Sequence, residues 1–114
     1  MSVLNVNLED SYQCKTSDQP ITIKVDIGDG QTGDFSVFLG TDLMDPPDLG
    51  VKDNVAGQKA TVVITITGSL SETTWTSVTI SIVEGDNTTS YGPYKKQLPQ
   101  NYDTVVYTLQ IHMS

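Results

Sequence analysis

The sequence predicts an all-β protein, an antiparallel sandwich of two sheets with about seven strands. Runs in which apolar and polar residues alternate recur along the 114 residues. Clusters of turn residues separate these runs at roughly regular spacing, and no segment shows a helical period. Alternation with a period of two is typical of a strand that buries one face. A small closed β-barrel is the alternative architecture.

The clearest alternation lies between residues 61 and 83. In its first run, Val62, Ile64 and Ile66 share one face, and in its second run Val78, Ile80 and Ile82 do so. Two neighbouring strands of this kind are most simply paired as an antiparallel hairpin. We therefore expect one central hairpin with a buried apolar face.

The N-terminal half contains three further strands. The first is Val3–Leu8, and its apolar parity continues through Tyr12 to Cys14, which directs the thiol towards the core. Ile21–Ile27 follows Pro20 as the second strand. The turn-rich stretch 28–34 then predicts a hairpin onto Phe35–Leu39, with Phe35, Val37 and Leu39 facing inward.

Periodicity disappears between Gly40 and Lys59, where a short strand is expected around Gly50–Val55. A connection of this length can carry the chain from one sheet to the other. Further on, Gly92 and Pro93 interrupt the strand Thr88–Lys96, so we expect it to be bulged or at a sheet edge. The final strand is Thr104–Met113, after a turn at 98–103. Its expected inward residues are Val105, Tyr107, Leu109, Ile111 and Met113.

The number and spacing of these strands resemble those of immunoglobulin-like and fibronectin type III sandwiches. The Cys…Trp…Cys spacing of true immunoglobulin domains is absent, and the spacing of Leu98, Pro99 and Tyr102 departs from that of fibronectin modules. The resemblance therefore covers the strand pattern alone and assigns the chain to no family.

The composition predicts a single domain over residues 1–114 and excludes an intrachain disulfide, because Cys14 is the only cysteine. Met1–Asp10 has no positive charge and no apolar run, so no signal peptide is expected there. We also find no apolar stretch of the roughly 18 residues that a membrane helix needs. Neither feature indicates a compartment.

The charge balance argues against nucleic acid and anionic membranes as partners. Fourteen acidic residues face six basic ones, which gives a net charge of −8. Phosphate backbones and anionic lipids are bound by clustered lysine and arginine. Acidity of this kind also keeps a β-protein dispersed and discourages pairing between sheet edges.

No pattern of catalytic residues is found, so we expect no enzymatic activity. His112 is the only histidine, its parity directs it outward, and no G-x-S-x-G motif accompanies it. Paired carboxylates occur by chance in a chain this acidic, and most of its acids are turn aspartates. The shortage of nitrogen and sulfur ligands also disfavours zinc and copper.

Calcium is the metal that the acidic residues fit best, because it prefers several oxygen ligands from loops. One candidate set lies on the longest loop and comprises Asp42, Asp45, Asp48 and Asp53. A second set flanks the 28–34 loop and comprises Asp26, Asp29 and Asp34. Neither set matches the EF-hand pattern, and turn chemistry alone also accounts for both.

Aromatic residues provide candidates for a sugar-stacking surface. Trp75 shares the parity of the polar face of its strand, and three tyrosines lie in the C-terminal region: Tyr91, Tyr94 and Tyr102. Trp75 also lies at a strand end, where it can instead close the core or contact another subunit. A carbohydrate-binding module is therefore the alternative function.

The function that the sequence favours is a non-catalytic module for protein–protein interaction or assembly. Thr88–Lys96 carries a glycine, a proline and two lysines, which protect an edge strand from pairing. Val3–Leu8 has no proline and no charge. If Val3–Leu8 is an edge strand, we expect it to pair with a partner's strand or with a second copy of the chain.

Overall fold

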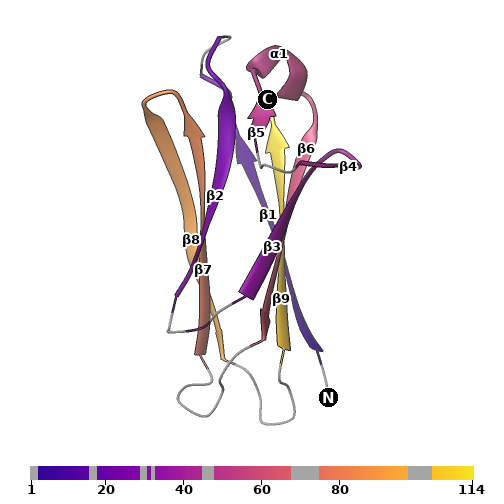
Figure 1. Cartoon of the computed structure of the whole chain (residues 1–114), viewed down its shortest axis with the longest axis vertical. Coiled ribbons are helices and arrows are strands. Elements are labelled where there is room, and N and C mark those ends of the chain that lie inside the picture. Colours follow the sequence, from indigo (N-terminus) through magenta and orange to yellow (C-terminus); the bar gives the residue numbers. More distant parts are fainter. Residues whose placement is uncertain are drawn as a thin grey trace.

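The computed structural model describes residues 3–15, 18–28, 31, 33–44, 48–67, 75–97 and 104–114. Two sheets pack against each other, which confirms the predicted all-β sandwich (Figure 1). The first sheet has the order β1-β9-β6-β3-β4 and the second β5-β2-β7-β8. The elements are β1 (Val3–Tyr12), β2 (Ile21–Ile27), β3 (Gly33–Leu39), β4 (Asp42–Leu43), β5 (Asp48–Gly50), α1 (Lys52–Val55), β6 (Lys59–Thr67), β7 (Trp75–Glu84), β8 (Asn87–Gln97) and β9 (Thr104–Met113).

Two predicted hairpins are wrong, the one within residues 61–83 and the one that joins Ile21–Ile27 to Phe35–Leu39. β6 pairs with β3 and β9 in the first sheet, whereas β7 pairs with β2 and β8 in the second. β2 and β3 likewise belong to different sheets. Alternation shows that a strand buries one face, but it does not identify the strand's neighbour. The hairpin that does form joins β7 to β8 through Gly85 and Asp86, where Gly85 has φ +58°.

The core lies between the inward faces of the two sheets and contains the predicted residues. Ile23, Ile64, Ile80 and Leu109 are each at most 1% exposed. The inward side of β9 is equally buried and comprises Val105, Tyr107, Leu109, Ile111 and Met113. Within this core, the Tyr107 hydroxyl lies 2.7 Å from that of Thr76, so a polar contact also connects the two sheets.

Two expectations about the strands near the 28–34 and 40–59 segments are wrong in detail. Phe35 is 41% exposed although Val37 and Leu39 on the same face are buried. β4 covers only the C-terminal end of β3, so the half that contains Phe35 lies at the open side of the sheet. The short strand expected around Gly50–Val55 ends at Gly50, and α1 follows it.

The first and last strands lie side by side and run in the same direction (Figure 1). All ten residues of β1 pair with β9, from Val3 opposite Thr104 to Tyr12 opposite Met113. Every other pair of the described strands is antiparallel, as predicted. This parallel pairing places β1 at the edge of the five-stranded sheet.

Candidate functional site

The backbone of β1 divides into groups that bind β9 and groups that point away from it. Tyr12 accepts a hydrogen bond at its carbonyl from the N–H of Ser114, 2.9 Å away, beyond the end of β9. Backbone groups alternate in direction along a strand. The N–H and C=O groups of the even-numbered residues of β1 therefore point towards β9, and those of the odd-numbered residues point away from it, outward in the plane of the sheet. Among the described strands, β9 is the only neighbour of β1.

The C-terminal end of this outward edge is already occupied. The N–H of Ser11 donates to the Asp10 carboxylate at 2.8 Å. The carbonyl of Ser11 accepts a hydrogen bond from the Tyr91 hydroxyl, also at 2.8 Å. Tyr91 belongs to β8, so it connects the edges of the two sheets. Within the described part of the chain, the outward N–H and C=O groups that remain open to a partner strand are those of Val3, Asn5, Asn7 and Glu9.

The other sheet edges carry features that oppose strand addition. β8 has a register shift at Gly92 and Pro93, and it carries Lys95 and Lys96 just before its last residue. β4 and β5 have only two and three residues. The parts of β2 and β3 that these short strands leave uncovered carry exposed charges, namely Lys24, Asp26 and Asp34. Among the sheet edges that the structure describes, only the Val3–Leu8 part of β1 has neither charge, proline nor bulge.

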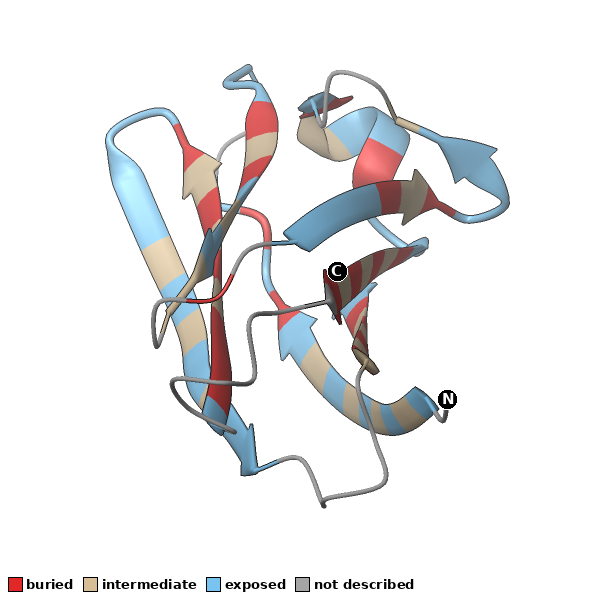
Figure 2. Ribbon diagram, turned by 60° about the horizontal axis from the view of Figure 1, so that its bottom comes forward, coloured by how far each residue is buried: buried red, intermediate tan, exposed pale blue. Residues whose placement is uncertain are grey.

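The inward side chains of β1 are incompletely covered. Leu4, Val6 and Leu8 pack against the core but are only partly buried, in contrast to the buried inward side chains of β9. Figure 2 shows this as alternating tan and pale blue along the strand that starts near the N-terminus. A strand added at this edge would cover these side chains as well as the open backbone groups.

The predicted aromatic residues lie on different faces of the second sheet. Tyr91 pairs with Ile80 and Tyr94 with Val78, and both tyrosines are half-buried on the inward side. Trp75 is 45% exposed at the start of β7, with the parity of the outer face. Tyr102 lies outside the described residues. The described aromatic residues therefore form no common stacking face, and carbohydrate binding stays a prediction.

The two tyrosines interact instead with the end of β1. Burial, followed by the nearby charges of Asp10 and Tyr94, raises the pKa of Tyr91 to about 12. Burial, followed by the nearby charge of Asp10, also raises the pKa of Tyr94. The Tyr91 hydroxyl donates to the Ser11 carbonyl, so this end of β8 contacts the end of β1.

The raised pKa of Tyr91 predicts a loss of stability in alkali. Because the unfolded chain releases this proton near pH 10 and the folded chain near pH 12, the contribution is complete below pH 10 and declines as the pH rises towards 12. Denaturant unfolding at pH 8–11.5 should show a shallower alkaline decline in Tyr91→Phe than in the wild type. The two proteins differ only in this hydroxyl, so parallel curves would contradict this assignment.

The acidic residues proposed for calcium are spread over several elements. Asp42 lies on β4, Asp48 on β5 and Asp53 in α1, and all three are exposed. The Asp48 carboxylate accepts a hydrogen bond from the Gly50 N–H at 3.0 Å, which is ordinary turn chemistry. Among the residues that the structure describes, no three acidic, histidine or cysteine side chains gather into a metal-binding group. Asp29 and Asp45 lie outside those residues, so the two calcium sets stay predictions.

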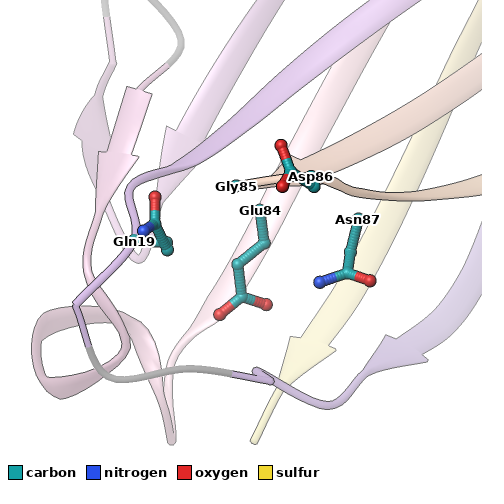
Figure 3. A pocket seen from close by; sticks show the side chains of 5 residues that line it. All are labelled: Gln19, Glu84, Gly85, Asp86 and Asn87. Atoms are coloured by element: carbon teal, nitrogen blue, oxygen red, sulfur yellow. The ribbon is translucent and has the colours of Figure 1, made fainter.

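A buried carboxylate that the sequence analysis did not single out lies at the end of β7. Glu84 is fully buried and accepts hydrogen bonds from the Tyr12 hydroxyl at 2.6 Å and from the Lys15 N–H at 2.9 Å. Its side chain points away from that of Asp86, and both residues line an open pocket of about 240 Å³ (Figure 3). The inward parity of Val78, Ile80 and Ile82, extended by two residues, would have placed Glu84 inside.

Cys14 and His112, the two residues considered as reactive groups, both lie in surroundings that give them a structural role. Cys14 is 3% exposed, as its parity predicted, and burial raises the pKa of its thiol, which makes the thiol a poor nucleophile. His112 is exposed, as predicted, and its Nε2 lies 2.6 Å from the Glu9 carboxylate on the neighbouring β1. This exposed contact joins the side chains of the two neighbouring strands on their outer face.

Comparison with protein-family models, with curated proteins and with solved structures found no match to this chain. The fold and the properties of its edges are therefore the basis for a function. Within the described parts of the chain, no helix is long and apolar enough to cross a membrane.

Proposed function

We propose that this protein is an interaction or assembly module that binds an extended segment of another polypeptide along β1. The observation that carries the proposal is the open edge of β1, where no described strand lies beside the outward backbone groups of Val3, Asn5, Asn7 and Glu9. Main-chain hydrogen bonds of an added strand supply affinity, and its side chains supply specificity.

The side chains of β1 favour a partner strand that alternates in the same way. The inward row of Leu4, Val6 and Leu8 is partly exposed, so apolar residues of an added strand would extend the core. The outward row contains Asn5 and Asn7, which form hydrogen bonds with polar side chains opposite. The negative charge of the rest of the chain would keep such a complex soluble.

The test uses synthetic heptapeptides that alternate valine with threonine or lysine, titrated into the full chain and followed by amide NMR shifts. We expect the largest shifts at Asn5, Asn7 and Glu9, whose N–H groups point outward. Asn5→Pro removes one of these groups but none of the bonds to β9, so it should weaken binding by about tenfold.

The matched control is Asn5→Thr, which keeps the backbone N–H and should bind the peptides nearly as well as the wild type. Circular dichroism must first show that Asn5→Pro keeps the wild-type fold. If no peptide shifts the β1 amides at millimolar concentration and the chain also stays monomeric, the proposed function is overturned.

A further inference from the structure

We infer that the strand that binds along β1 is the β1 strand of a second copy of this chain, arranged antiparallel about a two-fold axis at Val6. This inference rests on the proposed function and identifies its partner. Symmetric pairing of one surface with itself is the commonest way in which identical chains associate.

Backbone geometry selects this register. Because only odd-numbered residues point outward, an antiparallel pair must set odd residues of one copy opposite odd residues of the other. With the axis at Val6, Val3 lies opposite Glu9 and Asn5 opposite Asn7, so all four open residues take part, with about eight hydrogen bonds. An axis at Asn7 would instead require Ser11, whose backbone groups are already bound by Asp10 and Tyr91.

In this register, the side chains of β1 in one copy fit those of β1 in the other. Each Asn5 meets an Asn7 on the outer face, and amide side chains both donate and accept hydrogen bonds. On the inner face, Val6 meets Val6 and Leu4 meets Leu8, which would cover the partly exposed flank of the core. Apart from the exposed Val3–Glu9 pair at each end, the register therefore sets polar residues opposite polar ones and apolar residues opposite apolar ones.

Charge also favours a second copy at this edge and no other. The chain has a net charge of −8, but Val3–Leu8 carries none of it. Glu9 lies opposite Val3 in this register, so no two carboxylates face each other directly. The remaining open edges contain Lys24, Asp26 or Asp34, and β8 contains Lys95 and Lys96.

Sedimentation and cysteine cross-linking of the full chain test this arrangement. The wild type should convert from monomer to dimer as its concentration increases, and folded Asn5→Pro should need at least about tenfold more protein. Across the axis, Val6 pairs at a Cα separation of about 4.5 Å, within the range of a disulfide. Oxidised Val6→Cys should therefore form a covalent dimer, whereas the wild type, with buried Cys14 alone, should not.

Asn5→Cys and Asn7→Cys are the register controls, because each would lie diagonally from its own copy at about 7–8 Å, beyond easy disulfide formation. Cross-linking of either control in preference to Val6→Cys would overturn the register. A dimer that Asn5→Pro leaves unchanged would overturn pairing through β1. A monomeric wild type whose β1 amides still shift with heptapeptides would overturn the self-pairing and leave the proposed function standing.

Discussion

Replacing Ile64 or Ile80 with alanine is expected to lower the free energy of unfolding by about 2–5 kcal/mol, the range for truncating a buried aliphatic side chain. Each residue is 0% exposed, and they come from β6 and β7, the central strands of opposite sheets. Alanine would remove apolar contacts and leave a cavity that the two sheets cannot close completely. Denaturant unfolding at neutral pH measures the loss.

Leu43→Ala is the matched control, because Leu43 is 60% exposed on the short strand β4. Its substitution should change the unfolding free energy by about 0.5 kcal/mol or less. Core variants with stability equal to that of Leu43→Ala would show that these isoleucines do not form the interface between the sheets.

The core was predictable from the sequence because burial of one face leaves a period of two along each strand. This signal located β2 and β9 at their observed bounds and identified the buried side of β7. It also directed Cys14 inward, beyond the end of β1. Each of these inferences uses only the positions of a residue and its near neighbours.

Strand partners were not predictable in the same way. β6 and β7 have the most regular alternation, yet they face each other across the core instead of pairing in one sheet. Their separation in sequence, residues 68–74, is longer than a typical hairpin loop. The parallel pairing of β1 with β9 brings together the first and last strands of the chain. The residues near either strand contain no pattern that predicts such a distant partner.

The candidate site was predictable only in part for the same reason. The lack of charge and proline in Val3–Leu8 is a property of the sequence, but its position at a sheet edge depends on β9. The end of the open edge depends on Tyr91, 80 residues away from Ser11. Likewise, the contact between Tyr12 and Glu84 joins residues 72 positions apart.

Removing the hydroxyl of Tyr12 is the second substitution expected to have a large effect. Tyr12 is 3% exposed and donates at 2.6 Å to Glu84, a carboxylate with no exposed surface. A buried carboxylate needs its hydrogen-bond donors, because it has lost the water that would otherwise solvate it. Tyr12→Phe should therefore lower the unfolding free energy by about 1.5–3 kcal/mol, the range for hydrogen bonds to charged groups.

Tyr91→Phe provides the comparison, because it removes a hydroxyl that donates to the uncharged carbonyl of Ser11 at an exposed site. Its cost should be about 0.5–1.5 kcal/mol. In a double-mutant cycle, Tyr12→Phe combined with Glu84→Gln should be less destabilising than the sum of the two single substitutions, because both disrupt one contact. Additive effects, or a cost of Tyr12→Phe no larger than that of Tyr91→Phe, would mean that Glu84 draws its stabilisation from other donors, such as the N–H of Lys15.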